Sequence, residues 1–302
     1  MRAGTILRSA LAGALGLALI IGLFLFIGMP FKQFAALIVR IKFLPFAGIV
    51  VCSFLYVILG AAKWHLIAGV KPPRALFYTH YTAQAMLIGQ FLPPPVAIAA
   101  NRATVMKFKQ GVALKKGILN ALYDMGFDFM VAALLIPASL LQWAYRFNFG
   151  IWLLLGIFLL CSGAFLLAHA PKILPASWRV KLGIEDTQHH LLSQRLIGLM
   201  MLLSAARLGL VILRLALGAA TFAISVPFET VAYVVPPATM SALLVLTPAN
   251  LGIAEWSSTY LFALWGIPAV IGAFYGVSFR ILVFFSQLIV SAICWLLYRF
   301  GN

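Results

Sequence analysis

The stretch Thr247-Pro248-Ala249-Asn250-Leu251-Gly252-Ile253-Ala254-Glu255 lies inside an otherwise apolar half of the sequence. It combines a helix breaker, a flexible glycine and a carboxylate, each of which is unfavourable inside a lipid bilayer. A charged side chain near the bilayer centre costs at least about 2.5–3.5 kcal/mol, so it is a candidate for function. Irregular backbone at that depth must be buried in protein or line a water-filled cavity. Residues 247–255 are therefore predicted to form one wall of a substrate site in a membrane protein.

Composition supports that setting. The chain has 302 residues, of which 64% are hydrophobic and 9% charged, and its mean hydropathy is +1.07. A soluble domain carries about 25% charged residues. The fold class predicted is thus an all-α polytopic membrane protein, built as a single transmembrane domain over residues 1–302. The net charge of +16 lies mainly between apolar segments, which indicates membrane topology and anionic lipid headgroups and argues against a nucleic-acid partner.

Six apolar stretches are long enough to cross a bilayer of about 30 Å as helices. They are residues 11–29, 44–62, 117–142, 149–169, 196–226 and 268–298. The first has a core longer than that of a signal peptide and no good cleavage site after it, so it is expected to remain as an N-terminal helix. The second ends at Lys63-Trp64-His65, a mixture of cation and aromatic residues typical of a membrane interface.

Two further apolar segments are interrupted. Residues 75–98 contain Pro93-Pro94-Pro95, and residues 231–265 contain Pro236-Pro237 as well as the opening stretch. Proline lacks the amide donor and restricts the residue before it, so a helix does not continue through such a run. Both segments are predicted to be re-entrant hairpins. The basic stretch 101–116 that follows the first is either an interfacial segment or an ordinary cytoplasmic loop.

With both hairpins re-entrant, six spans place both termini on the side where most Lys and Arg residues fall, which predicts cytoplasmic termini. The two hairpins then enter from opposite sides. The chain divides into an N-terminal helix and loop (1–43), a first repeat (44–142), a linking helix and cytoplasmic loop (149–195) and a second repeat (196–298). This is an inverted-topology repeat, in which paired interrupted segments mark the binding site of a transporter.

The charged residues within apolar segments allow two interpretations. Arg102 and Glu255 either bind substrate or form an internal salt bridge. In the first case the arginine binds a lipid phosphate, and the glutamate carries a proton or contacts a cationic headgroup. Asp124 and Asp128 share one helix face; they either couple transport to protons or tie helices together through cations. The cations available within apolar segments are Arg207, Arg214 and Arg280.

The residues 246–255, followed by Gly266-Ile267-Pro268 and Arg280, resemble a signature of the lysylphosphatidylglycerol synthase transmembrane (flippase-domain) family of bacterial membrane proteins. Residues 91–95 with Arg102 resemble its first motif, although residues 96–101 lack that motif's glycines and aspartate. Asp124 falls where this family often has an Asp-Arg pair. The resemblance covers roughly residues 45–298. It implies a stand-alone flippase-like protein, since the chain ends at Asn302 before any aminoacyltransferase domain.

The function expected is transport of a phospholipid or lipid-linked envelope precursor across the bacterial inner membrane. The alternatives are a membrane enzyme acting on a lipid phosphate and a non-transporting partner of an envelope-biosynthesis enzyme. Partners expected are an anionic phospholipid or polyprenyl-phosphate-type lipid, and a homodimer or biosynthetic partner. No catalytic residue, metal or cofactor is predicted. The substrate-binding residues predicted are Asn101, Arg102, Thr247, Pro248, Asn250, Gly252, Glu255 and Arg280.

Overall fold

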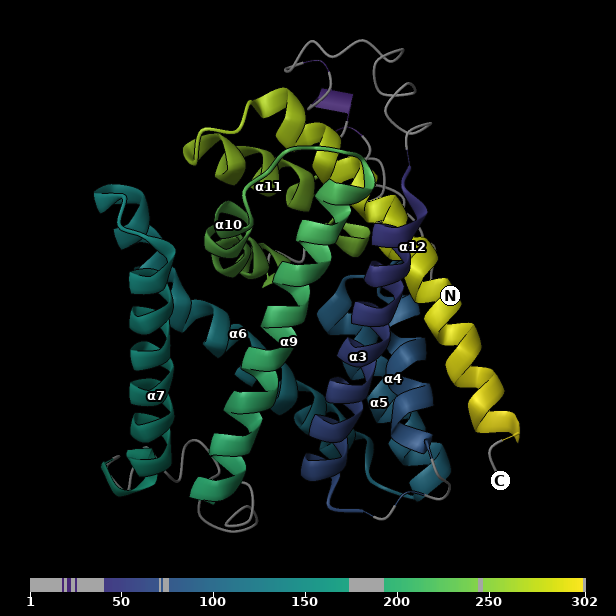
Figure 1. Cartoon of the computed structure of the whole chain (residues 1–302). Coiled ribbons are helices and arrows are strands. Elements are labelled where there is room, and N and C mark those ends of the chain that lie inside the picture. Colours follow the sequence, from purple (N-terminus) through teal and green to yellow (C-terminus); the bar gives the residue numbers. More distant parts are fainter. Residues whose placement is uncertain are drawn as a thin grey trace.

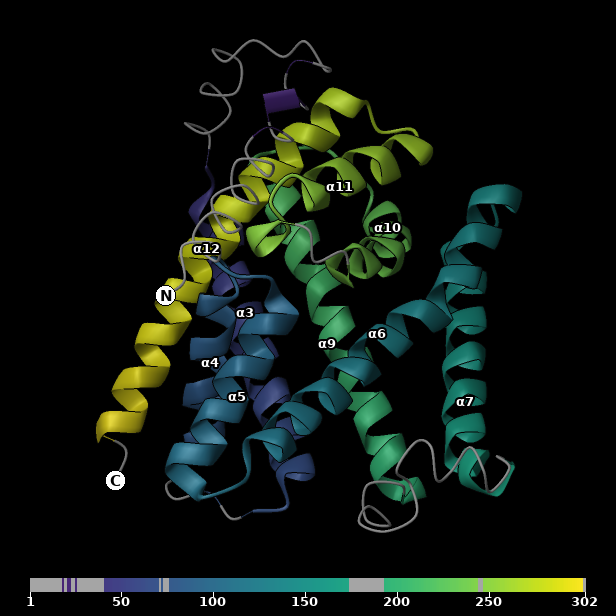
Figure 2. The ribbon, with the colours of Figure 1, turned by 180° about the vertical axis from the view of Figure 1, so that it is seen from behind.

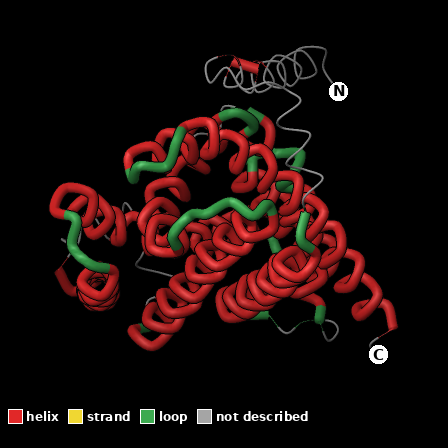
Figure 3. The backbone as a smooth tube through the Cα atoms, turned by 45° about the horizontal axis from the view of Figure 1, so that its top comes forward, coloured by secondary structure: helices red, strands yellow, loops and turns green. Residues whose placement is uncertain are grey.

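The computed structural model describes residues 41–70, 72, 76–173, 193–243 and 247–300, together with residues 18, 21, 22 and 25. Every regular element within these ranges is a helix (Figure 3). The all-α fold class is therefore confirmed. The predicted span 11–29 and most of the polar loop 170–195 lie outside the described residues.

Five helices in the described part of the chain are long and apolar enough to cross a membrane, which confirms a multi-pass membrane protein. They are α3 (Phe43–Ala68), α6 (Leu114–Tyr145), α7 (Phe149–Ile173), α9 (Gln194–Thr221) and α12 (Ala269–Phe300). Large apolar side chains such as Phe43, Leu154 and Leu202 point away from the protein, as lipid-facing residues do. In the orientation of Figure 1, α3 and α12 run downwards and α9 runs upwards.

Four shorter helices form the two interrupted segments. They are α4 (Phe77–Ile88), α5 (Pro94–Gln110), α10 (Phe228–Met240) and α11 (Ile253–Leu264). These helices have 12 to 17 residues, so they are about 18–26 Å long and shorter than a hydrocarbon core of about 30 Å. Each pair therefore enters and turns back. The α4–α5 hairpin occupies the lower part of Figure 1 and the α10–α11 hairpin the upper part.

The turns of the two hairpins follow from different sequence features. In the first, Pro93 is the N-cap of α5, and Pro94 and Pro95 take its first positions, where proline costs no hydrogen bond and its φ already suits a helix. In the second, Ala249 and Asn250 have φ values of 52° and 55°. Left-handed backbone is uncommon for residues other than glycine, so this turn needs contacts that hold it.

Two predicted boundaries are wrong. The returning leg of the first hairpin continues to Gln110 instead of ending at residue 98. The stretch 101–116 is therefore neither a separate interfacial segment nor a loop, and Arg102 is buried within α5. The second span continues to Ala68 rather than ending at residue 62, so Lys63 lies inside a helix and is fully buried. In both cases the buried cation is paired with carboxylates of α6.

The helices fall into two sets of four that pack in the same pattern, α3 to α6 and α9 to α12. Helix α3 packs along α9, α5 along α6, and α11 along α12. Each hairpin also packs against the long last helix of the other set: α4 contacts α12, and α10 contacts α6 (Figures 1 and 2). Helix α7 stands at the edge against α6 and α9.

Close approach between α5 and α6 requires a small residue. A Cβ atom added to Gly117 would lie 2.6 Å from the backbone Cα of Ala103, closer than real Cβ contacts. Gly126, on the same helix, has nothing within 4 Å of the corresponding position. The two glycines of α6 thus differ in whether helix packing depends on them.

Candidate functional site

A cavity of about 320 Å³ lies between the turns of the two hairpins, and α9 and α12 complete its wall. The first hairpin contributes Gly89, Gln90 and Pro94, and the second contributes residues on both sides of its break. A smaller cavity of about 150 Å³ adjoins it and shares Gln90 and Arg214. The polar residues that line the larger cavity are Gln90, Arg214, Thr239, Ser241, Asn250, Glu255, Ser258, Tyr275 and Arg280.

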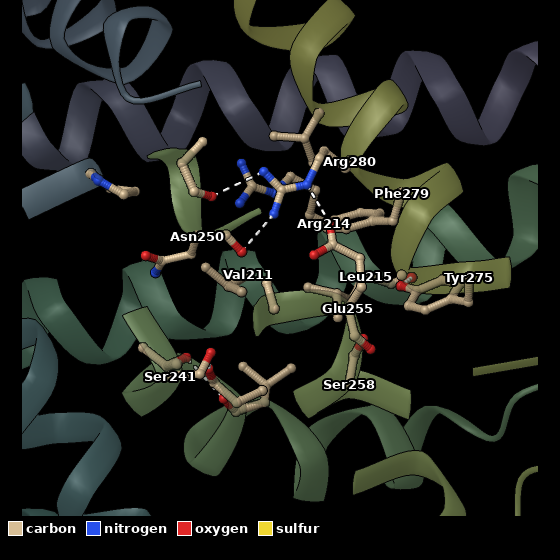
Figure 4. Close-up of a pocket in the computed structure, with 18 of the residues that line it drawn as sticks. Val211, Arg214, Leu215, Ser241, Asn250, Glu255, Ser258, Tyr275, Phe279 and Arg280 are labelled. Atoms are coloured by element: carbon tan, nitrogen blue, oxygen red, sulfur yellow. Dashed lines mark hydrogen bonds and ion pairs between the residues drawn. The ribbon is translucent and has the colours of Figure 1, made fainter. Parts of the chain in front are cut away.

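Arg280 of α12 holds the break of the second hairpin. Its Nε donates to Glu255 Oε1, while Nη1 and Nη2 donate to the carbonyl oxygens of Ala249 and Asn250 at 2.9 and 3.2 Å (Figure 4). These are the two residues with positive φ, so the guanidinium stabilises the left-handed turn directly. Charge-assisted hydrogen bonds are about twice as strong as neutral ones. Arg280 therefore lies at the cavity as predicted, with each of its three nitrogens already bonded to protein.

Glu255 has a similarly complete set of partners. Its Oε1 accepts from Arg280, and its Oε2 accepts from the backbone N–H of Gly252 at 2.8 Å, which caps the N-terminus of α11. Gly252 has a φ of 83°, a conformation that favours glycine. Glu255 is 1% exposed. The carboxylate predicted to carry a proton or contact a headgroup is thus held by a cation and a helix end.

The remaining predicted residues of the stretch 247–255 differ in whether they hold the turn or face the cavity. Thr247 is buried and donates to the Leu251 carbonyl at 2.9 Å, which closes the turn that begins at Pro248. Asn250 is 4% exposed and lines the cavity, and its Oδ1 has no hydrogen-bond partner among the residues that the structure describes. Buried polar atoms are bonded in most proteins, so Asn250 Oδ1 is an acceptor available to a ligand.

A second group of charges lies outside this cavity. Lys63 Nζ is 2.7 Å from Asp124 Oδ1 and 2.5 Å from Asp128 Oδ1. Asp124 Oδ2 is 2.5 Å from Arg102 Nη2, and Asp128 Oδ2 pairs with Arg207. Three cations and two carboxylates therefore form one network, named here the Lys63 network, that joins α3, α5, α6 and α9. Asp124 and Asp128 act as ties between helices; their use in proton coupling stays a prediction.

The predicted association of Arg102 with Glu255 is replaced by two separate pairs. Arg102 pairs with Asp124, its neighbour across the α5–α6 turn, and Glu255 pairs with Arg280. Asn101, also predicted at the site, donates to the Tyr81 carbonyl at 2.7 Å and so ties α5 to α4. Neither Asn101 nor Arg102 lines the 320 Å³ cavity.

Two contributing residues were missed from the sequence. From the sequence, Lys63 was expected at a membrane–water interface. The acidic pair on α6 required cations nearby, and this requirement was a signal that Lys63 could be buried beside it. Tyr56 of α3 stacks on Arg207, with 4.1 Å between the ring centroid and the guanidinium carbon. The same ring is 5.4 Å from the guanidinium carbon of Arg214, so it contacts both a cation of the Lys63 network and an arginine that lines the cavity.

Arg214 differs from the other cations within the apolar helices. It lines both cavities. Among the described residues, Lys63, Arg102, Arg207 and Arg280 each form an ion pair, whereas Arg214 forms none. Within the described part of the chain, its buried Nε has no hydrogen-bond partner. Arg214 therefore supplies an uncompensated positive charge at the cavity.

The described residues contain no group of three or more His, Cys, Asp and Glu side chains that would hold a metal ion. Neither the curated proteins nor the solved structures compared with this chain include a match. A family model, the lysylphosphatidylglycerol synthase TM region, matches residues 11–291. That range includes all four hairpin helices, both cavities and the Lys63 network. The chain therefore belongs to the lysylphosphatidylglycerol synthase TM region family.

Proposed function

We propose that the protein is a flippase-like transporter, which moves a phospholipid or a lipid-linked envelope precursor between the leaflets of the bacterial inner membrane. The observation that carries this proposal is the cavity between the two hairpin turns. A site built from interrupted helices of both halves is the arrangement by which transporters bind substrate near the bilayer midplane.

The packing pattern supports an inverted repeat in which residues 44–142 and 196–298 are equivalent. The correspondence pairs α3 with α9, α4 with α10, α5 with α11, and α6 with α12. Every packing contact named above within or between the two sets of four has its counterpart under this exchange. Movement of the two repeats, with each hairpin carried along by the long helix of the other repeat against which it packs, would then expose the cavity to each leaflet in turn.

The lining of the cavity favours a lipid over a wholly polar solute. Its polar groups are accompanied by apolar side chains from α9, α10 and α12, including Val211, Val235 and Phe279. Its volume of about 320 Å³ is at the lower end of small-molecule sites. That space suits a headgroup, while acyl chains remain outside among the apolar surfaces. The exposed Lys107, Lys109, Lys115 and Lys116 at the α5–α6 turn support the proposed orientation, in which both termini are cytoplasmic.

Reconstitution into liposomes tests the proposal. Purified protein should move fluorescently labelled phosphatidylglycerol from the inner to the outer leaflet, where dithionite quenches it. Glu255→Gln should slow movement about tenfold, because Arg280 and the α11 N-terminus lose their charged partner, a loss of at least roughly 1.4 kcal/mol. The matched control is Glu229→Gln, since Glu229 is an exposed glutamate in the first turn of α10.

The same assay separates the alternative functions. Release of phosphate or headgroup without transbilayer movement would identify an enzyme instead. No movement of any labelled lipid, together with unchanged cellular function of Glu255→Gln at normal protein levels, would leave a non-transporting partner protein.

A further inference from the structure

Arg214 lies in α9, and its guanidinium Cζ is 5.4 Å from the ring centroid of Tyr56 and 6.0 Å from that of Phe279. Stacking on aromatic faces stabilises a cation by roughly 0.5–2 kcal/mol without neutralising its charge. These two rings therefore favour the placement of the guanidinium at the cavity wall and leave its charge uncompensated.

The charge balance at the cavity requires an anion. Two arginines line the cavity, and among the described lining residues Glu255 is the one carboxylate. Because Glu255 is paired with Arg280, the charge of Arg214 is left over. The adjacent Lys63 network carries three cations against two carboxylates, so it supplies no spare anion either. Arg214 is only partly exposed, and charges that are largely removed from water are normally paired, so we assign the missing partner to the ligand.

We propose that Arg214 binds the phosphodiester of a lipid headgroup with a net charge of minus one. This inference rests on the proposed function, whose cavity it occupies. Arginine presents two parallel N–H donors that match two phosphate oxygens. Figure 4 shows Arg214 beside Arg280, with Ser241 and Ser258 on the opposite side of the opening.

The headgroup beyond the phosphate should be a hydroxyl donor and not a cation. Asn250 Oδ1 is a buried acceptor without a partner, and it accepts a hydrogen bond from a hydroxyl. An ammonium group would instead seek a carboxylate, yet both oxygens of Glu255 are already bonded to Arg280 and Gly252. A hydroxylated anionic lipid such as phosphatidylglycerol thus fits better than a zwitterionic or aminoacylated one.

Binding is measured on the purified full chain in detergent by native mass spectrometry, which needs no transport. Short-chain phosphatidylglycerol is compared with phosphatidylethanolamine, lysyl-phosphatidylglycerol, diacylglycerol and the soluble diester glycerophosphoglycerol. Phosphatidylglycerol should bind best. Arg214→Gln should weaken it about tenfold to hundredfold, and Arg214→Lys should weaken it less, because the charge remains. The matched control is Arg299→Gln: Arg299 is exposed and likewise lies 5.3 Å from an aromatic ring centroid, that of Trp295.

Several results would overturn this assignment. Equal binding of diacylglycerol and phosphatidylglycerol would exclude phosphate recognition, and so would unchanged phosphatidylglycerol binding in correctly folded Arg214→Gln. Tighter binding of lysyl-phosphatidylglycerol or phosphatidylethanolamine would show that the site selects a cationic group. Equal binding of glycerophosphoglycerol would make the ligand a soluble diester. Failure of transport with Arg214-dependent lipid binding intact would refute the proposed function and leave this inference standing.

Discussion

Neutralising Lys63 should destabilise the protein less than neutralising Asp124, although both side chains are almost completely buried. The reason is the charge balance of the Lys63 network. Lys63→Met leaves two complete pairs, Arg102 with Asp124 and Arg207 with Asp128. Asp124→Asn instead leaves three cations around one carboxylate.

The geometry sets the sizes of the two effects. Lys63 loses contacts to two carboxylates and to the Asp124 carbonyl, at about 1.5–3 kcal/mol for each charge-assisted bond. Removal of the surplus charge and good packing of the methionine chain offset part of that loss. We expect a net cost of about 1–3 kcal/mol for Lys63→Met. Asp124→Asn leaves buried cations unpaired and should cost about 3–5 kcal/mol.

In the double variant, the effect of Lys63→Met on the free energy of unfolding should change sign. In the Asp124→Asn background, Lys63→Met removes one of the unpaired cations, so it should stabilise the protein instead of destabilising it. Unfolding in detergent by heat or denaturant measures all three variants. Tryptophan fluorescence provides a local signal, because the Trp64 ring centroid lies 4.8 Å from the Arg102 guanidinium carbon. Lys115→Met serves as the control, since Lys115 is exposed on α6.

The reasoning would be refuted if Lys63→Met proved more damaging than Asp124→Asn. It would also fail if the double variant were no more stable than Asp124→Asn alone. Either outcome would mean that the five charges do not act as one network.

Two further predictions concern packing and topology. Gly117→Ala should destabilise the α5–α6 contact by about 1–3 kcal/mol, because the added Cβ meets backbone, whereas Gly126→Ala should stabilise α6 by about 0.5–1 kcal/mol; unfolding midpoints distinguish them, and equal effects would contradict the packing. In a background without native cysteines, Lys109→Cys and Tyr145→Cys, both exposed, should react with a membrane-impermeant maleimide from opposite sides, with Lys109→Cys on the cytoplasmic side. Labelling of both from one side would exclude the proposed topology.

The hairpins were predictable because their signals are local. Three successive prolines interrupt one apolar segment, and Pro248 with Gly252 interrupts the other. Such residues act within a few positions, through a missing donor or a permitted φ. The boundaries were less accurate where charge was involved, since Arg102 continues α5 past the expected end only because α6 supplies Asp124.

The sequence indicated which charged residues lie within the apolar segments. It did not indicate which of them form ion pairs with one another. Lys63 with its neighbours Trp64 and His65 has the composition of an interface, and only packing between α3 and α6 makes it a buried counter-ion. Arg207 and Arg214 are seven residues apart on similar faces, so sequence treats them alike. Arg207 lies level with Asp128, whereas no carboxylate among the described residues reaches Arg214. That difference of two helical turns separates a structural tie from a free cation.

The exchange of hairpins between the two sets of helices has a mechanical consequence. Because α4 rests on α12 and α10 rests on α6, neither half of the sequence can move as a separate block without leaving a hairpin behind. The interlocked units are each a hairpin from one half together with a long helix from the other. A cut between α7 and α9 would divide the chain into fragments that each lack the surface needed to seat their own hairpin. Exposure of the cavity to either side therefore demands cooperation between segments almost two hundred residues apart in the sequence, such as α4 and α12.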